Sequence, residues 1–201
     1  MELLELSSKN LEKIDKKLYE KIIKEYNYDL VIFIARGSYQ IGKDLAEFNK
    51  VPVTEIFATR KGGKLKKLIR PLLQIIPKKI KKSLREKEFN SNIHEKNFER
   101  EISYNEEIWK NYLECKSILL VDDSVDTGYS IKFTKKAIEK FFTNSTVKVA
   151  ALNCFEKSKK IVKTDFYIYK DTMLKGPWSN DSRENKEYLK KYGEWHEKQS
   201  R

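Results

Sequence analysis

The sequence predicts an α/β protein in which a mainly parallel, twisted sheet is flanked by helices. Short apolar runs of strand length alternate with segments whose apolar residues recur every three or four positions, as in helices. One run, Ile118–Val121, ends on two adjacent carboxylates, Asp122 and Asp123. An earlier run, Leu30–Ala35, ends on Arg36. Polar residues directly after apolar strands are typical of the carboxyl edge of an open α/β sheet, where ligands bind.

The first part of the chain alternates helix and strand. Apolar side chains spaced three and four apart predict an amphipathic helix over residues 8–26; they are Leu11, Ile14, Leu18, Ile22 and Tyr26. The elements expected next are a strand at Leu30–Ala35, a helix at Ile41–Phe48 and a strand at Val51–Phe57.

Regular patterning returns at Ser103, after a polar and poorly patterned stretch over residues 88–102. Ser103 and Glu106 have the spacing of a capping box, which predicts a helix start followed by the face Ile108, Trp109, Tyr112 and Leu113. The later elements expected are a strand at Ile118–Val121, a helix through Phe142, strands at Val147–Phe155 and Phe166–Tyr169, and a terminal helix near 183–198.

Composition excludes several classes of protein. The 201 residues are long enough for one domain with a core, and no run approaches the roughly 18 apolar residues of a membrane span. The start of the chain lacks the basic and apolar regions of a signal peptide. Cys115 and Cys154 form no metal-type pair, so they are expected to be small buried side chains. A cytoplasmic, reduced protein is therefore expected.

The formal net charge of +12 is concentrated in one segment and predicts an anionic partner. Residues 60–87 contain twelve basic residues and one acid, interleaved with leucine and isoleucine and interrupted by Pro71 and Pro77. Three interpretations remain open for this segment. The first is a solvated, flexible excursion over the active site, and the second is a surface for nucleic acid or another partner. The third is an amphipathic segment on an anionic membrane. We expect a single domain over residues 1–201, with 60–102 as a basic insertion.

The stretch after Val121 has the chemistry of a sugar-phosphate site. Asp122 and Asp123 are candidates to hold ribose hydroxyls or a magnesium complex, because magnesium favours one or two carboxylates plus substrate phosphate oxygens. Residues 126–130 supply backbone N–H groups and the hydroxyls of Thr127 and Ser130, and Gly128 permits close approach and positive φ. An ordinary strand-to-helix turn would explain a bare Asp-Thr-Gly, but it does not explain the whole pattern.

The stretch Leu120–Ser130 closely resembles the phosphoribosyl-pyrophosphate motif of the type I phosphoribosyltransferases. Ser124 replaces the usual aliphatic residue, and Ser130 replaces the commoner threonine. The resemblance implies that Asp122 and Asp123 hold the ribose hydroxyls, directly or through Mg²⁺. It implies that the 5-phosphate is wrapped by Asp126, Thr127, Gly128, Tyr129 and Ser130, and that Asp126 lies near N7 of a purine as general base.

A second match lies at Val31–Tyr39, which resembles the first strand and pyrophosphate loop of that family. Arg36 would meet the leaving pyrophosphate, and Gly37 would let the backbone turn. In the family a non-proline cis peptide often joins the basic residue to the glycine. Ser38 stands where many members have a second glycine, and it is included among the expected substrate contacts.

A third match is the C-terminal hood expected at residues 156–182. Asp165–Tyr169 and Gly176–Trp178 resemble the hood of xanthine and hypoxanthine-guanine enzymes, with Thr164 in place of a proline. Trp178 would stack on a purine, or else pack within the hood. Lys157 would contact the exocyclic oxygen of the base, with Lys159 and Lys160 as competitors for that role.

The reaction implied is Mg²⁺-dependent transfer of a phosphoribosyl group from phosphoribosyl pyrophosphate to a purine-like nitrogenous base, with release of pyrophosphate. Fixed carboxylates would matter because positive charge develops near ribose C1. Two rivals remain: a phosphoribosyl-pyrophosphate-sensing regulator that binds nucleic acid through residues 60–87, and a phosphoribosyltransferase with a non-purine acceptor. Family members often form dimers or tetramers, so a homodimer is also expected among the partners.

Overall fold

The computed structural model describes residues 3–60 and 99–199. The chain divides into two compact units, one of residues 1–58 with 102–201 and one of residues 59–101. Of the second unit, Thr59, Arg60 and residues 99–101 are described. The predictions for the basic segment 60–87 therefore lie outside the described residues, apart from Arg60.

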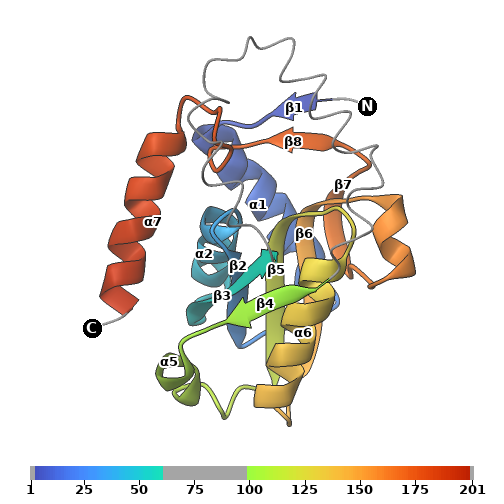
Figure 1. The fold of residues 1–201 in the computed structure, drawn as a ribbon, viewed down its shortest axis with the longest axis vertical. Coiled ribbons are helices and arrows are strands. Elements are labelled where there is room, and N and C mark those ends of the chain that lie inside the picture. Colours follow the sequence, from blue (N-terminus) through green and yellow to red (C-terminus); the bar gives the residue numbers. More distant parts are fainter. Residues whose placement is uncertain (1–2, 61–98, 200–201) are drawn as a thin grey trace. The chain divides into compact units, whose positions relative to one another are not determined.

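The elements alternate as the sequence predicts (Figure 1). The helices are α1 (Ser8–Ile22), α2 (Tyr39–Asn49), α5 (Glu106–Lys110), α6 (Tyr129–Phe141) and α7 (Asn185–Gln199), with a 3-10 helix η2 (Glu156–Lys160). The strands are β1 (Leu3–Glu5), β2 (Leu30–Ala35), β3 (Val53–Arg60), β4 (Arg100–Ser103), β5 (Ser117–Val125), β6 (Thr146–Cys154), β7 (Phe166–Lys170) and β8 (Met173–Lys175).

The main sheet has the strand order β4-β3-β2-β5-β6-β7. The pairs β2–β3, β2–β5, β5–β6 and β6–β7 are all parallel, and β1 pairs with β8 in a separate parallel ribbon. From β2 the chain passes to β3 on one side and then to β5 on the other. The strand order therefore reverses between β2 and β5, which is where open α/β sheets bind ligands. The predicted α/β fold with a mainly parallel sheet is confirmed.

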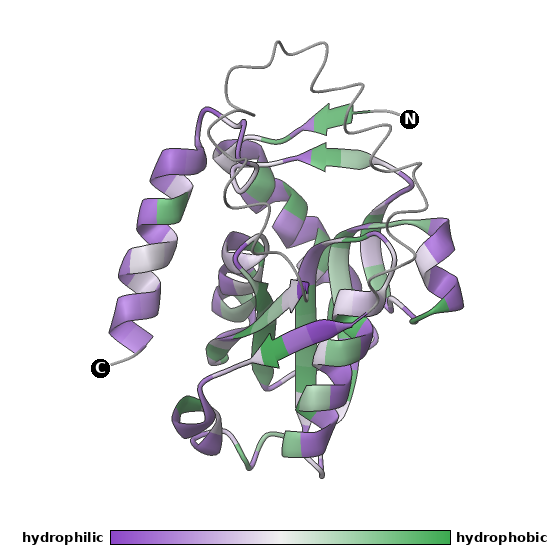
Figure 2. Cartoon of the chain, viewed as in Figure 1, coloured by the Kyte–Doolittle hydropathy of each residue, from purple (hydrophilic) through white to green (hydrophobic). Residues whose placement is uncertain are grey.

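Alternation along the strands builds a core on each face of the sheet. Val31 and Phe33 of β2 pack with α1, α2 and α7, whereas Leu30, Ile32 and Ile34 pack with α5 and α6. Strands buried on both faces read as continuous apolar runs. Figure 2 shows the central strands largely green, whereas the helices mix green and purple segments.

Several predicted boundaries were wrong. Asn105, not Ser103, caps α5, because its side chain accepts hydrogen bonds from the N–H groups of Glu107 and Ile108. Ser103 instead ends β4, a strand in the stretch expected to be poorly patterned, and Leu113 is half exposed rather than part of a buried face. The short strands β1 and β8 were not predicted.

Two further expectations concern single features. Cys154 is buried and Cys115 is partly buried, as small apolar side chains would be. No helix among the described residues is both long enough and apolar enough to cross a membrane.

Candidate active site

The two sequence motifs meet at the carboxyl ends of β2 and β5. These strands are direct neighbours in parallel register, with Phe33 opposite Val121. Arg36, Gly37 and Ser38 follow β2, and the acidic motif lies at the end of β5. The point where the strand order reverses therefore carries both predicted halves of the site.

The strand β5 is longer than predicted and includes the paired acids. It continues to Val125 because its pairing with β6 continues as far as Val125 opposite Cys154. Asp122 is 8% exposed, and one of its carboxylate oxygens accepts a hydrogen bond from the N–H of Asp123 at 3.0 Å. The acids are therefore held by a strand, not by a loop.

The paired acids resist ionisation. Burial, followed by the charge of Asp123, holds the pKa of Asp122 well above its usual range. Burial raises the pKa of Asp123 to about 6, and the charge of Asp126 acts in the same direction. Two carboxylates so placed favour a ligand that brings hydroxyl donors or positive charge.

The turn after β5 has the form of an anion-binding helix start. Gly128 has φ +83°, and a Cβ atom there would lie 2.8 Å from Cγ1 of Val162, so no other residue fits without strain. Tyr129 begins α6, and Thr127, Tyr129 and Ser130 are each partly exposed. Backbone N–H groups at such a terminus attract phosphate.

The loop after β2 lies directly against the acids. A Cβ atom at Gly37 would lie 3.1 Å from Oδ1 of Asp123, so a larger residue would press on that carboxylate. The cis peptide bond precedes Arg36, between Ala35 and Arg36, instead of joining Arg36 to Gly37 as expected.

The buried side chain of Ser38 hydrogen-bonds to both strands that carry the motifs, β2 and β5. Its buried hydroxyl lies 2.5 Å from the carbonyl oxygen of Ile34 in β2 and 3.2 Å from that of Val121 in β5. A ligand contact from this residue would therefore use the backbone, because the hydroxyl already bonds to the two strands.

The terminal helix α7 contributes a residue that sequence patterns did not indicate. The hydroxyl of Tyr188 lies 2.7 Å from the carbonyl oxygen of Arg36 and 2.8 Å from that of Gly37. Tyr188 is 5% exposed, and burial raises its pKa, so the hydroxyl keeps the proton that it shares between the two carbonyls. Further along α7, Tyr192 donates to Glu55 of β3 at 2.6 Å, and His196 contacts the same carboxylate.

The two hood residues lie in different surroundings. Trp178 is partly buried, and its ring lies close against Gly176 and 6.4 Å from the ring of Tyr188. Lys157 is exposed on η2, with Nζ 5.8 Å from the ring of Phe155. The segment after η2 touches the turn after β5, through Val162 near Gly128. The loop thus contacts the acids through Gly37, and Trp178 lies beside Tyr188, which bonds to that loop.

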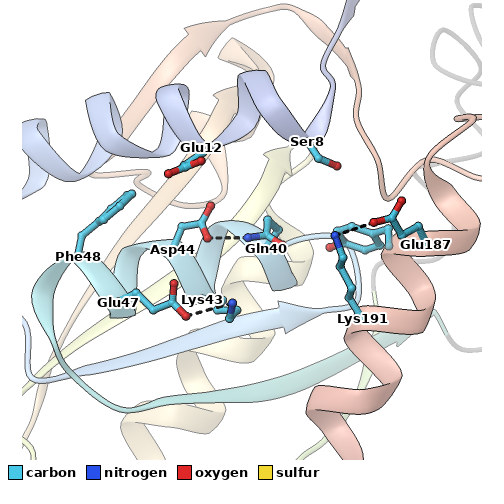
Figure 3. Close-up of a pocket in the computed structure, with 10 residues that line it drawn as sticks. Ser8, Glu12, Gln40, Lys43, Asp44, Glu47, Phe48, Glu187 and Lys191 are labelled. Carbon is cyan, nitrogen blue, oxygen red and sulfur yellow. Dashed lines mark hydrogen bonds and ion pairs between the residues drawn. The ribbon is translucent and has the colours of Figure 1, made fainter.

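A pocket of about 290 Å³ lies between α1, α2 and α7 (Figure 3). It is lined by Ser8, Glu12, Gln40, Lys43, Asp44, Glu47, Phe48, Glu187, Tyr188 and Lys191. Gln40 donates to Asp44 at 2.6 Å, as the dashed line in Figure 3 marks. Beside Asp44 lies Asp15, which is fully buried on α1.

The fold, with its two loops at the reversal of strand order, is that of the type I phosphoribosyltransferases. A purine phosphoribosyltransferase from Pyrococcus horikoshii Ot3 matches with a TM-score of 0.60 and 18% identity, over 90% of this chain and 97% of that chain. A Helicobacter pylori xanthine-guanine-hypoxanthine phosphoribosyltransferase matches with a TM-score of 0.62 and 15% identity, over 92% of this chain and 99% of that chain. A hypothetical protein from Neisseria gonorrhoeae, solved with bound ppGpp, matches with 0.62 and 19%, over 94% of each chain.

No family model and no curated protein matches the sequence. Identities below 20% establish the fold alone. The resemblance to type I phosphoribosyltransferases drawn from the motifs is confirmed at that level.

Proposed function

We propose that this protein transfers a phosphoribosyl group from phosphoribosyl pyrophosphate to a purine-like base and releases pyrophosphate. The observation that carries the proposal is the contact between the two motifs, with Gly37 placed against the carboxylate of Asp123. An acidic pair, an anion-binding turn and a basic loop within one site match a substrate that has ribose hydroxyls, a 5-phosphate and a pyrophosphate.

Each group has a role in this proposal. The turn Asp126–Ser130 binds the 5-phosphate through backbone N–H groups and hydroxyls, and Asp122 with Asp123 holds the ribose diol. Arg36 neutralises charge on the departing pyrophosphate. A bond forms from a ring nitrogen to ribose C1 as the C1–oxygen bond to pyrophosphate breaks, and Asp126 accepts the proton that the base gives up.

Magnesium fits this site as a partner of the substrate. Among the described residues, no group of three or more His, Cys, Asp or Glu side chains is arranged to hold a metal ion. Asp122 and Asp123 do supply the two carboxylates that Mg²⁺ uses alongside phosphate oxygens. When bound, Mg²⁺ would neutralise the pyrophosphate as it leaves.

The deciding assay supplies phosphoribosyl pyrophosphate and Mg²⁺ with hypoxanthine, guanine, xanthine or adenine, and follows pyrophosphate release. Turnover with one base, lost in Asp126→Asn and in Arg36→Ala, is the expected result. Lys157→Ala and Trp178→Ala then test the base contacts, and both should raise KM for the base more than KM for the sugar. Tight binding of phosphoribosyl pyrophosphate with no turnover on any base would reject purine transfer and favour a different acceptor.

The basic segment favours one second candidate, a sensor that binds phosphoribosyl pyrophosphate and nucleic acid. Residues 60–87 hold most of the excess positive charge, which suits a polyanion. A gel-shift titration with and without phosphoribosyl pyrophosphate tests this candidate, and vesicles of anionic lipid test the membrane alternative. The Neisseria gonorrhoeae neighbour was solved with ppGpp, so ppGpp belongs among the competitors in the binding assays.

A further inference from the structure

Ser124 occupies the usual aliphatic position of the motif and hydrogen-bonds to Asp126, the proposed general base. Its hydroxyl lies 2.9 Å from Oδ1 of Asp126. Ser124 is opposite Asn153 in the β5–β6 register, and Nδ2 of Asn153 lies 3.1 Å from the same hydroxyl oxygen. Oδ1 of Asn153 in turn accepts a hydrogen bond from the N–H of Thr172 at 3.1 Å. A line of three hydrogen bonds therefore ends on Asp126.

The direction of every proton in this line is determined. The N–H of Thr172 can only donate, so the oxygen of the Asn153 amide must face it, and the NH₂ group must face Ser124. Asn153 is fully buried and cannot turn over to water. Ser124 accepts from that NH₂ group, so its own proton is free to point at the carboxylate of Asp126.

We propose that Ser124 and Asn153 are positioning residues that hold Asp126 ionised and oriented to take the proton from the incoming base. This inference rests on the proposed function. A hydrogen bond to an ionised acceptor is stronger than one between neutral groups, and it favours the charged form. Ser124 thus does for Asp126 what the aliphatic residue of the usual motif cannot do.

The line also connects Asp126 to the expected hood. Thr172 lies between β7 and β8, and β8 pairs with β1 in the two-stranded ribbon. A shift of this segment would withdraw the N–H from Asn153, and the amide would no longer be held toward Ser124. The orientation of Asp126 is therefore coupled to the position of the segment that leads into β8.

Two substitutions of matched shape test the inference. Ser124→Thr keeps the hydroxyl, Ser124→Val replaces it with a methyl group, and both β-branched residues suit a strand. Ser124→Thr should stay within about twofold of the parent protein, whereas Ser124→Val should lower kcat about tenfold, which is the scale of a lost bond to a charged group. KM for phosphoribosyl pyrophosphate should not change. The acid limb of the pH–kcat profile should move up by about one pH unit in the valine variant only.

Ser145→Ala is the matched control. Its hydroxyl donates to the carbonyl oxygen of Cys115 at 2.5 Å, just before β6 begins, so the variant also loses a partly buried serine bond. Its pH–kcat profile should coincide with that of the parent protein.

A titration of the Asp126 carboxyl carbon by ¹³C NMR, without substrate, separates this inference from the proposed function. A higher titration midpoint in Ser124→Val than in Ser124→Thr supports the positioning bond even if no base is turned over. Equal midpoints, or equal pH–kcat profiles, in the threonine and valine variants would overturn the inference while leaving the transferase activity intact.

Discussion

The hydroxyl of Tyr188 lies within 2.8 Å of the carbonyl oxygens of both Arg36 and Gly37, across 152 positions of sequence from Arg36. A side chain from α7 therefore holds the backbone of the loop proposed to bind pyrophosphate. The ring of Tyr188 also packs edge-on against Tyr39, the first residue of α2, with centroids 6.0 Å apart. The loop is fixed on both sides of its turn.

Replacing Tyr188 by phenylalanine should weaken binding of phosphoribosyl pyrophosphate. The two loop carbonyls lose their donor while the ring stays in place, so the loop gains freedom that the ligand must then remove. We expect the Kd to rise about three- to tenfold and unfolding stability to fall by about 1 kcal/mol. Isothermal titration calorimetry and urea unfolding measure the two effects.

Tyr192→Phe is the matched control for that experiment. Tyr192 is on the same helix and donates to Glu55, not to the loop. Tyr192→Phe should lose about as much unfolding stability as Tyr188→Phe. Its Kd for phosphoribosyl pyrophosphate should equal that of the parent protein. Equal Kd changes in both variants would show that α7 as a whole, and not the Tyr188 bond, supports the loop.

Neutralising Asp123 should stabilise the protein without ligand while abolishing its binding of phosphoribosyl pyrophosphate. The pKa of Asp123 is raised from its ordinary value of 3.8 to about 6, so the folded state holds this proton more tightly than the unfolded state does. The carboxyl therefore lowers stability progressively as pH rises from about 4 through about 6.

Asp123→Asn should accordingly match the parent protein in stability near pH 4 and exceed it by on the order of 1 kcal/mol at pH 7.5. Ligand affinity in the parent protein should rise over the same interval, as Asp123 ionises. Thermal unfolding and ligand binding between pH 4 and pH 8 measure both trends. A variant that is less stable than the parent protein at pH 7.5 would contradict the assignment.

Asp15→Asn should also stabilise the protein at neutral pH. Burial, then the charge of Asp44, raises the pKa of Asp15 well above its usual range, and burial raises the pKa of Asp44. Neither oxygen of Asp15 meets a donor group among the described residues, so its contact with Asp44 becomes a hydrogen bond only when the pair holds a proton. An amide at position 15 would donate to Asp44 at every pH.

The gain from Asp15→Asn should be near zero at pH 4 and grow to about 1–3 kcal/mol by pH 8. Asp29→Asn is the contrasting control, because Asp29 accepts bonds from the N–H groups of Lys116 and Ser117 at 2.8 and 3.0 Å. An amide there loses an acceptor, so that variant should be less stable at pH 7. Urea unfolding of both variants across this pH range decides the sign.

Gly128→Ala should destabilise the protein and weaken binding of the 5-phosphate. The residue would need φ +83°, and its Cβ atom would displace Val162. We expect a loss of at least about 1 kcal/mol and a clear loss of affinity for ribose 5-phosphate. Gly193→Ala on α7 should do the opposite, since its Cβ atom would meet nothing within 4 Å and alanine favours helix by about 1 kcal/mol.

Local patterns predicted β2, β3, β5, β6, β7 and the main helices, because apolar runs and Gly-containing turns are determined by neighbouring residues. They also predicted that the two motifs would follow β2 and β5. The Tyr188 bond and the line from Thr172 to Ser124 depend on pairs far apart in the chain, and no local pattern carries them. Ser103 does not cap α5 because Asn105, two residues later, also carries a side chain that accepts backbone hydrogen bonds. Ser103 is instead the last residue of β4. The strands β1 and β8 are too short to be recognised without each other.

The position of Tyr188 in the chain has a consequence for the order in which the protein is made. Every strand of the main sheet lies before residue 171, so the sheet can assemble while α7 is still inside the ribosome. The hydrogen bonds from Tyr188 to the carbonyl oxygens of Arg36 and Gly37 can form only after residue 188 has left the ribosome. A nascent chain would thus have the acids and the turn after β5 in place before the loop that follows β2 is fixed.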